Sequence, residues 1–316
     1  MKIVFFGTPL FAAHTLDQLI HHGCTISAVV TMPDRPKGRS GTPVAPPVKV
    51  LINKHSPLVP VLQPEKASDP VFIEELASFK ADLFIVVAYG QILKQKVLDL
   101  PRLGSINVHA SILPYYRGAA PIQRCIIDGN TEAGVTIMRM VRKMDAGDML
   151  LVSKMPIPFE MTAGELEEGL CALGSKALLE VLPLIQSGTQ KEIPQDEEAA
   201  TFAPKVEQED AELTWELDAK DVFNRYRGVT PRPGAWAWLS VRGVKKRLKI
   251  FHAEFVSDIH GVAGSLLEDP KKGLLVACAK SALRLVDIQL EGKKRVAARD
   301  FLNGIKRSDL SFYVPE

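Results

Sequence analysis

The sequence has little cysteine. Four cysteines occur in 316 residues, Cys24, Cys125, Cys171 and Cys278, and they are widely spaced. No pair forms a Cys-x-x-Cys motif, and no group of histidines and cysteines has the spacing of a zinc site. We therefore expect no disulfide framework and no metal. Free thiols are typical of the reducing cytoplasm, which is where we place the protein.

Long apolar runs are also missing. No stretch approaches the roughly 18 uninterrupted apolar residues that a membrane-spanning helix needs. The segment from Met1 to Ile20 has a lysine before apolar residues, as a signal peptide does, but Gly7-Thr8-Pro9 interrupts it. A strand, a turn and a helix explain this segment better, so we predict neither a signal peptide nor a membrane span.

The turn after that first strand has only one glycine. A dinucleotide-binding fingerprint needs three glycines between strand and helix, so Gly7-Thr8-Pro9 argues against a nicotinamide cofactor. Open parallel sheets nevertheless place their functional sites at the carboxyl ends of strands, which directs the search for a site to those positions.

The chain has almost no net charge, at +2. The residues from Val241 to the end contain 15 Lys and Arg against 9 Asp and Glu, a net of +6, whereas the rest of the chain has a net of −4. A basic C-terminal third suits a polyanionic partner, although a solvated charged face would explain the same composition.

Apolar runs alternate with helical patterns through the first 186 residues. This alternation predicts an α/β domain with a parallel sheet covered on both faces. The expected strands are Ile3 to Phe6, Ile26 to Val30, Leu58 to Leu62, Leu83 to Ala88, Ile106 to Val108 and Val135 to Met140. The expected helices are Leu10 to Ile20, Val71 to Phe79, Ile122 to Ile127 and Met161 to Gln186.

A polar segment follows, from Ser187 to Gln208, and contains Gln195-Asp196-Glu197-Glu198. We interpret this acidic run as a solvated linker. Beyond it, short alternating segments such as Leu248 to Phe255 and Ala282 to Ile288 predict a small β-rich domain, plausibly a barrel. The expected division is a domain over 1–188, a linker over 189–208 and a barrel over 209–316.

The residues most suggestive of chemistry are Asn107, His109 and Asp145. In an extended strand Asn107 and His109 point to the same face, at the strand end where a parallel sheet exposes reactive groups. Asp145 lies in a turn after the strand that ends near Val141 and could project its carboxylate back toward them. Each residue also has a structural explanation: a satisfied core histidine, a capping asparagine and an ordinary turn aspartate.

Together these residues suit the attack of an amine on a carbonyl carbon. The Asn107 amide can donate a hydrogen bond to the developing oxyanion. A carboxylate beside His109 would fix the tautomer of the imidazole and suit it to acid–base work. Ser111 could be considered as a nucleophile, but an attacking amine needs none, and we assign Ser111 to a binding loop.

A series of motifs resembles the methionyl-tRNA formyltransferase family over essentially the whole chain. The Asn-x-His pair with its distant aspartate resembles the whole group of formyltetrahydrofolate-using enzymes. The motif Pro33-Asp34-Arg35-Pro36 and the segment from Ala203-Pro204-Lys205 to Trp236 narrow the resemblance to the tRNA-modifying branch. The other matching motifs are Phe6-Gly7-Thr8-Pro9, Ser111-Ile112-Leu113-Pro114, Arg117-Gly118-Ala119-Ala120-Pro121-Ile122-Gln123, Gly134-Val135-Thr136-Ile137 and Asp145-Ala146-Gly147-Asp148.

The resemblance implies transfer of a formyl group from 10-formyltetrahydrofolate to the amino group of methionyl initiator tRNA. It gives Asn107, His109 and Asp145 the catalytic roles and assigns the folate site to Ser111, Ile112, Leu113 and Pro114. It implies a Rossmann-like domain followed by a smaller OB-like β-barrel, without a metal and without an obligate protein partner.

The same resemblance makes the loop from Asp34 to Pro47 a tRNA contact through Arg35, Lys37 and Arg39. A plain surface loop is the alternative. The loop departs from the family pattern, because Ser40-Gly41-Thr42 stands where a run of lysines is common. Thr230-Pro231-Arg232-Pro233 also departs from the Asn-Pro-x-Pro motif that is usual in the family. Binding of tRNA is therefore expected to depend more on the basic C-terminal third.

Two other functions remain open at this point. One is a formyltransferase that acts on a small amino sugar or nucleotide, which would need neither a basic barrel nor a basic loop. The other is a non-catalytic RNA-binding relative, which would not need the three residues Asn107, His109 and Asp145 together.

Overall fold

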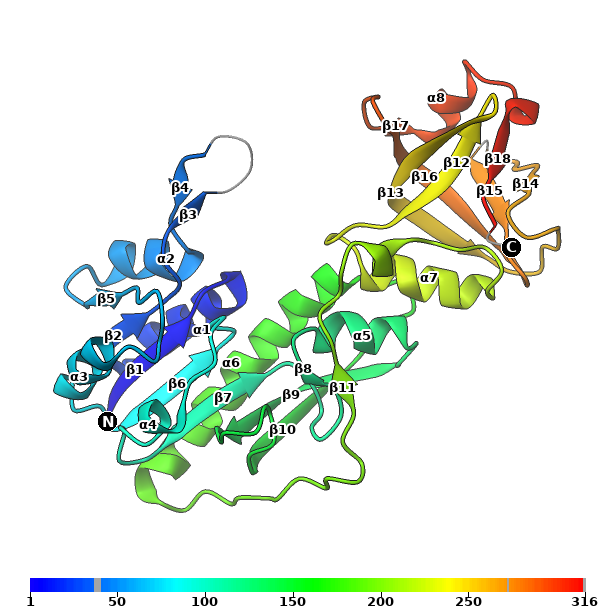
Figure 1. Ribbon diagram of the computed structural model, residues 1–316. Helices are drawn as coiled ribbons and strands as arrows, with labels where there is room; N and C mark the ends of the chain where they lie inside the picture. Colours follow the sequence, from blue (N-terminus) through cyan, green and yellow to red (C-terminus); the bar gives the residue numbers. More distant parts are fainter. Residues whose placement is uncertain (37–40, 272, 315–316) are drawn as a thin grey trace. The chain divides into compact units, whose positions relative to one another are not determined.

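The computed structural model describes residues 1–36, 41–271 and 273–314, and these residues divide into two units. The N-terminal unit carries a seven-stranded sheet in the order β10-β9-β7-β6-β1-β2-β5 (Figure 1). Its strands are β1 (Lys2–Gly7), β2 (Thr25–Val30), β5 (Val61–Leu62), β6 (Leu83–Val87), β7 (Ser105–His109), β9 (Glu132–Arg139) and β10 (Met149–Pro156). The N-terminal unit comprises Met1–Pro121, Glu132–Pro156 and Glu167–Ala203. The C-terminal unit comprises Ile122–Thr131, Ile157–Leu166 and Pro204–Glu316.

The expected parallel sheet is confirmed for five of these strands, β5, β2, β1, β6 and β7. It is wrong for β9, which runs antiparallel to β7, with His109 opposite Thr136. The helix between these two strands, α5 (Pro121–Ile127), has only seven residues, and most of it belongs to the C-terminal unit. The chain therefore makes no crossover connection between β7 and β9. Instead, β9 begins beside the carboxyl end of β7 and runs in the opposite direction.

One expected strand is shorter than its apolar run. The run from Leu58 to Leu62 contributes only Val61–Leu62 to the sheet, because Leu58 lies in a turn and is 96% exposed. An apolar residue in a surface turn is a common reason for such an error, since composition alone does not show which residues are covered.

Helices cover both faces of the sheet, as expected for strands that are apolar throughout. On one face, α6 (Ala163–Ser187) lies against the sheet, where a Cβ on Gly174 would meet Val108 and Val135. Helix α1 (Leu10–His21) packs beside α6, and α2 (Pro47–His55) packs on α1. On the other face, α3 (Pro70–Ser78) and α4 (Gln95–Leu98) join one apolar cluster with β1, β2 and β6.

The C-terminal unit is an antiparallel β-barrel preceded by a helix, which confirms the expected OB-like barrel (Figure 1). Its strands follow the order β14-β15-β16-β13-β12-β18, and β17 pairs with β16. The elements are α7 (Ala219–Gly228), β12 (Trp236–Val241), β13 (Val244–Val256), β14 (Leu266–Leu267), β15 (Leu274–Ala277), β16 (Ala282–Leu290), β17 (Val296–Ala297), α8 (Ala298–Leu302) and β18 (Leu310–Phe312).

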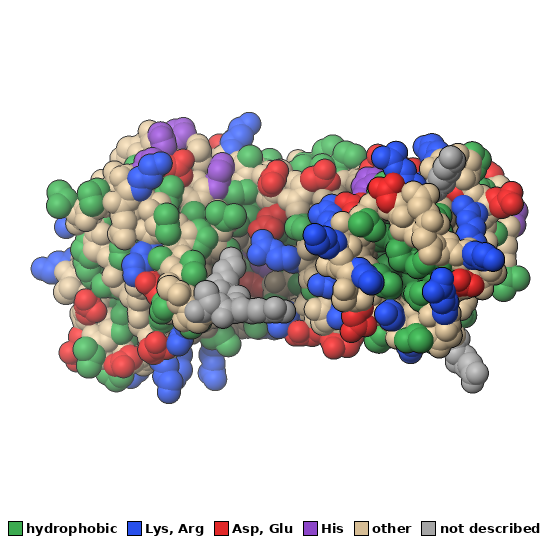
Figure 2. Space-filling model, turned by 90° about the horizontal axis from the view of Figure 1, so that it is seen from above, with side chains coloured by type: hydrophobic (Ala, Val, Ile, Leu, Met, Phe, Trp, Pro, Cys, Tyr) green, Lys and Arg blue, Asp and Glu red, His purple; other side chains and the backbone are tan. Residues whose placement is uncertain are grey.

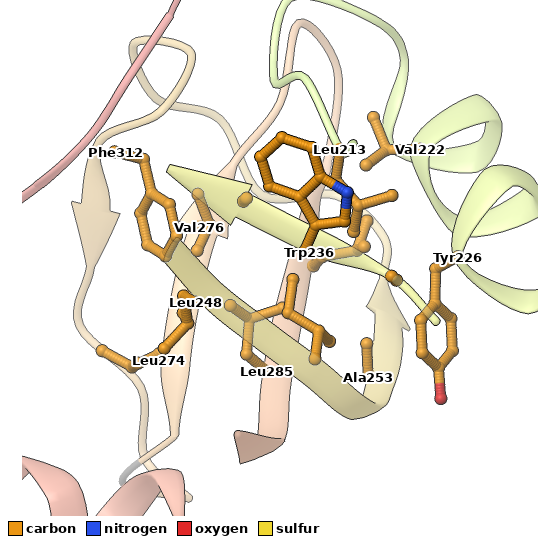
Figure 3. Close-up of a cluster of buried hydrophobic side chains, with 14 of the residues drawn as sticks. Leu213, Val222, Tyr226, Trp236, Leu248, Ala253, Leu274, Val276, Leu285 and Phe312 are labelled. Carbon is orange, nitrogen blue, oxygen red and sulfur yellow. The ribbon is translucent and has the colours of Figure 1, made fainter. Parts of the chain in front are cut away.

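The barrel core comes from the alternation of its strands. Residues such as Leu248, Leu274, Val276 and Leu285 point inward, and Figure 3 shows them gathered with Phe312. Each such side chain contributes about 1.5–3 kcal/mol when fully buried. Of the intervening residues of β13, Lys245 and Lys249 are exposed.

None of the helices in the described ranges combines the length and the apolar character that crossing a membrane would require.

Candidate active site

His109 is the last residue of β7 and is held at both ring nitrogens. Its Nε2 lies 3.0 Å from the carbonyl oxygen of Tyr116, and its Nδ1 lies 3.7 Å from Oδ2 of Asp145. A carbonyl oxygen only accepts hydrogen bonds, so Nε2 carries a proton in this arrangement. Nδ1 is therefore the nitrogen on the side of the carboxylate. The residue is only 6% exposed, which restricts the ring to this orientation.

Asp145 comes from the loop that joins β9 to β10. Because β9 is antiparallel, its end lies beside Ile106, at the start of β7, and the loop returns along β7 to reach His109. As expected, Asp145 lies in a turn, in which the amide of Ala146 donates to the carbonyl of Lys143 at 3.4 Å. The backbone of Asp145 is in the left-handed region, with φ of 50°, and its Oδ2 accepts a 2.8 Å hydrogen bond from the amide of Gly118.

The amide that binds Asp145 belongs to a residue that must be glycine. Gly118 lies in β8 (Arg117–Gly118), which pairs with β11 (Phe202–Ala203). Its φ is 125°, and a Cβ at this position would lie 2.8 Å from the carbonyl oxygen of Ala203. Any side chain would therefore push β8 away from β11 and displace the donor to Asp145.

Asn107 lies two residues before His109 and faces the same side of β7. Val108, between them, faces the opposite side and is covered by α6. Successive side chains of a strand alternate between faces, so the Asn107 carboxamide and the His109 imidazole project from one surface, with Cα atoms about 7 Å apart. Asn107 is half-buried, whereas His109 is buried. The structure thus brings together all three candidate catalytic residues.

This arrangement can hold and move a proton. In the neutral imidazole, Nδ1 has a free lone pair and can accept a proton from a reacting group. The resulting imidazolium would have both N–H groups facing an oxygen, that of Tyr116 at Nε2 and that of Asp145 at Nδ1. The carboxamide of Asn107 can donate a hydrogen bond beside it. Such a set suits acyl transfer to an incoming amine without a protein nucleophile.

The Ser111–Pro114 loop is held in place from within the protein. The hydroxyl of Ser111 donates to the carbonyl of Tyr115 at 2.6 Å. Thr136, which is fully buried on β9, donates to the carbonyl of Ser111 at 2.7 Å and accepts from the amide of Leu113 at 3.1 Å. The side chains of Ser111 and Leu113 are buried, while Ile112 and Pro114 are partly exposed. The surface that this loop offers to a ligand is therefore mainly that of Ile112 and Pro114.

The acidic run at 195–198 is not simply a solvated linker, which corrects our interpretation. Gln195 is buried, and its Oε1 accepts hydrogen bonds from Nε and Nη2 of Arg117, at 3.0 and 2.8 Å. Its Nε2 donates to the carbonyl oxygens of Asp145 and Gly147, at 2.8 and 2.7 Å. Glu197 binds the same guanidinium through two contacts of 3.1 Å.

Sequence reasoning missed Gln195 because nothing near it in the chain marks it. Arg117 offered the one signal, since an arginine between apolar segments needs a buried acceptor when it is covered. Its side chain is completely buried. The identity of the acceptor, 78 residues away, could not be read from the sequence.

The cysteines provide no nucleophile for this site. None of the four, all within the described residues, forms a disulfide, and burial raises the pKa of Cys171 to about 11 and that of Cys278 to about 12. Such thiols stay protonated near neutral pH and are poor nucleophiles. Within the part of the chain that the structure describes, no cluster of three or more His, Cys, Asp or Glu side chains could hold a metal ion.

The three candidate tRNA contacts of the loop are only partly described. Arg35 lies in β3 (Arg35–Pro36), which pairs with β4 (Pro43–Val44), and its guanidinium binds the carboxylate of Glu65. Its neighbour Asp34 binds Lys49 and Gln63, and these hydrogen bonds, that of Gln63 above all, lower the pKa of Asp34. Lys37 and Arg39 lie outside the described residues.

Basic and aromatic side chains lie side by side on the outer face of the barrel. The ammonium of Lys245 is 4.6 Å from the ring centroid of Trp238 and 4.5 Å from that of Tyr313. The guanidinium of Arg247 is 4.0 Å from the centroid of Trp236. Trp236 is itself buried in the barrel core, so we define the barrel stripe as the other cluster, Trp238, Lys245 and Tyr313. Many Lys and Arg side chains surround this unit on the face that Figure 2 shows. Aromatic rings among cations are typical of nucleic-acid-binding surfaces.

Comparison with known sequences gives two family matches. The profile described as formyl transferase matches residues 1–182, and the profile described as formyl transferase, C-terminal domain, matches residues 205–306. The methionyl-tRNA formyltransferase of Protochlamydia amoebophila strain UWE25 is 48% identical over 99% of this chain and 98% of its own. That of Chlamydia pneumoniae is 46% identical over 96% of this chain and 95% of its own.

Solved structures with lower sequence identity share the fold. The N-formyltransferase of Helicobacter canadensis, in complex with folinic acid and dTDP-3-aminofucose, has a TM-score of 0.68 at 15% identity, covering 90% of this chain and 98% of its own. HypX of Aquifex aeolicus, in complex with tetrahydrofolic acid, has a TM-score of 0.65 at 19% identity, covering 96% of this chain and 47% of its own.

Proposed function

The chain belongs to the formyl transferase family, and from this premise we propose that it transfers the formyl group of 10-formyltetrahydrofolate to the amino group of methionyl initiator tRNA. Relatives that carry the name methionyl-tRNA formyltransferase align over nearly the full length of both chains, so both units are included in the comparison. The observation that carries the proposal is the pairing of His109 with Asp145 at the end of β7, with Asn107 on the same face.

The reaction forms one C–N bond and breaks another. The amine of the methionyl group attacks the formyl carbon, and the carbonyl electron pair moves to oxygen, where the Asn107 amide donates a hydrogen bond to it. Nδ1 of His109 takes the proton that the amine loses, and the imidazolium rests between Asp145 and the carbonyl of Tyr116. Collapse of the oxyanion breaks the bond to the donor nitrogen, which receives that proton.

The folate donor fits the surroundings of this trio. Two rigid loops border it, the Ser111–Pro114 loop and the loop that carries Asp145. The loop after β6 leaves the same edge of the sheet and presents Ile92, which is 79% exposed, while the Asp145 loop presents Met144, which is 60% exposed. Apolar side chains next to a few fixed polar groups suit a flat aromatic ring system. In this proposal, Ile112 and Pro114 contribute to the donor site.

The tRNA partner is supported by the barrel stripe. Lys245 can bind a phosphate, and its aromatic neighbours Trp238 and Tyr313 can stack on exposed bases. Arg35, Lys37 and Arg39 remain our candidates for contact with the tRNA from the N-terminal unit. Arg35 would have to exchange its partner Glu65 for a phosphate, which costs little at an exposed site.

A formylation assay tests the proposal. Purified protein is incubated with 10-formyltetrahydrofolate and either charged initiator tRNA, free methionine or an amino-sugar nucleotide. We expect product only with the charged tRNA. Transfer to the amino sugar instead would favour the small-acceptor alternative. If no acceptor is formylated under conditions in which a known formyltransferase works, the proposed function is wrong.

A further inference from the structure

A side-chain clasp joins the polar segment after α6 to the loop that carries Asp145. We define the clasp as Gln195, Arg117 and Glu197. Gln195 makes two contacts with Arg117 and two with the carbonyls of the Asp145 loop, all between 2.7 and 3.0 Å. Glu197 binds the same arginine and also the ammonium of Lys143, which belongs to that loop. The catalytic loop is therefore tied twice to a segment about 50 residues later in the chain.

The orientation of the Gln195 amide follows from its partners. Carbonyl oxygens only accept and a guanidinium only donates, so Nε2 must face the loop and Oε1 must face Arg117. Every polar atom of this amide is engaged. The completely buried side chain of Arg117 has its charge balanced by Glu197 and its hydrogen bonds accepted by Gln195 and Glu197. A buried network that is fully satisfied holds its members in a single geometry.

The Asp145 loop needs such support. The residues from Val141 to Met144 are exposed, so solvent rather than protein covers one side of the loop. Asp145 itself has a positive φ, a conformation that is uncommon for non-glycine residues, although aspartate tolerates it better than most. The bonds from Gln195 engage the carbonyls of Asp145 and Gly147, which lie on either side of Ala146. They hold the stretch of backbone from which the Asp145 carboxylate reaches the amide of Gly118 and lies beside His109.

We propose that Gln195 is a positioning residue for formyl transfer, holding the Asp145 backbone so that its carboxylate stays beside Nδ1 of His109. This inference rests on the proposed function, because it assigns Gln195 to the same reaction. Gln195 does not touch the reacting atoms. It acts through Asp145, and a loop held less well would leave substrate binding intact while the carboxylate spent less time in place.

Substitution of Gln195 by glutamate is the sharpest test. Gln195→Glu keeps the shape and the contacts with Arg117 but places a carboxylate oxygen against two carbonyl oxygens, so both bonds to the loop are lost. We expect kcat for formylation to fall by about 10- to 100-fold, as for a catalytic group displaced by about 1 Å. KM values for the folate donor and for charged tRNA should change by less than about 3-fold. The matched control is Glu198→Gln, in an exposed residue of the same run.

Hydrogen–deuterium exchange measured on the same variants shows whether the effect is local. In Gln195→Glu, faster exchange should be confined to peptides from the Asp145 loop, with the sheet and the barrel unchanged. If Gln195→Glu does not fold, Gln195→Met replaces it, since methionine conserves the volume and removes all four hydrogen bonds.

The possible outcomes separate the inference from the proposed function. If kcat of the variant stays within about 2-fold of the unmodified enzyme, the clasp does not position Asp145. If KM rises as strongly as kcat falls, or exchange accelerates across the sheet, Gln195 has only a general structural role and the inference is wrong. If the unmodified enzyme formylates no charged tRNA at all, the proposed function fails instead.

Discussion

At the residue scale, the site depends on how each polar group is satisfied. His109 has an oxygen near each ring nitrogen, and Asp145 has a backbone donor at 2.8 Å on the oxygen that faces the ring. These contacts orient both groups before any substrate arrives. A preoriented pair needs no reorganisation during the reaction, which is the main source of catalytic power in such sites.

Asp145→Asn should separate catalysis from binding. The amide keeps the size of the carboxylate but cannot balance an imidazolium. We expect kcat to fall by about 100-fold or more, whereas the affinity for charged tRNA stays within about 2-fold. Steady-state formylation and filter binding measure the two quantities. Glu74→Gln, in an exposed residue of α3, is the control. Unchanged turnover in Asp145→Asn would mean that this carboxylate is not catalytic.

Glu197 provides a pH-dependent contribution to stability. Hydrogen bonds from Arg117 and then from Lys143 lower the pKa of its carboxyl from 4.5 to about 2. Between these two pH values the unfolded chain binds the proton that the folded chain excludes, so the free energy of unfolding rises with pH. The stabilising contribution is complete above about pH 5 and is lost as the pH falls through about 2.

Glu197→Gln should flatten this dependence. We expect the free energy of unfolding of the variant, measured by urea denaturation between pH 5 and pH 3, to fall less steeply than that of the unmodified protein. The difference should shrink in high salt, because the carboxylate is exposed and its ion pairs are screened. If the free energy of unfolding depends on pH in the same way in both proteins, the ion pairs of Glu197 do not contribute to stability.

At the element scale, the antiparallel direction of β9 decides what surrounds the end of β7. It places Thr136 opposite His109 and beneath the Ser111–Pro114 loop. If β9 were parallel to β7, its carboxyl end would lie beside His109 in place of Thr136. The Ser111–Pro114 loop would then lack the two hydrogen bonds of Thr136. The two-sided hydrogen bonding of Thr136 is what keeps the loop close to the sheet.

Thr136→Val should loosen that loop. Valine has the same shape but leaves the buried amide of Leu113 and the carbonyl of Ser111 without this partner. We expect the free energy of unfolding to fall by about 1–3 kcal/mol. The KM for 10-formyltetrahydrofolate should rise more than that for charged tRNA. Thr25→Val, in an exposed residue at the start of β2, serves as the comparison. If the KM for 10-formyltetrahydrofolate is equal in both variants, the Ser111–Pro114 loop does not belong to the donor site.

At the scale of the whole molecule, the two proposed sites lie in different units. The candidate catalytic groups all lie in the N-terminal unit, and the barrel stripe lies in the C-terminal unit. A chain with a net charge of only +2 has no strong overall field. Recognition of a polyanion must therefore come from local groups of basic side chains.

Binding of tRNA should depend on salt through the barrel. Lys245→Gln combined with Lys249→Gln removes two exposed cations from the outer face of β13. We expect the plot of log affinity against log salt concentration to become shallower by about 1 to 2. The kcat at saturating tRNA should stay unchanged. Lys54→Gln with Lys66→Gln, also exposed but in the N-terminal unit, is the matched pair. An equal slope in both pairs would exclude the outer face of β13 as a phosphate-binding surface.

The sequence by itself determined the central strands of the N-terminal sheet and the shared face of Asn107 and His109. Apolar runs identified β1, β2, β6 and β7, because a strand covered on both sides must be apolar throughout. The two-residue alternation placed Asn107 and His109 together, because it is a local property of any extended chain. The basic balance of the last third likewise pointed to the unit that carries the barrel stripe.

Only the tertiary structure decided the direction of β9, the path by which Asp145 reaches His109 and the burial of Gln195 among its hydrogen-bond partners. Each of these depends on contacts between residues that are far apart in the chain, such as the 78 positions between Arg117 and Gln195. A polar residue in a flexible-looking segment and one that completes a buried network have the same local sequence signature. The difference arises from which buried donors and acceptors the folded chain leaves to be satisfied.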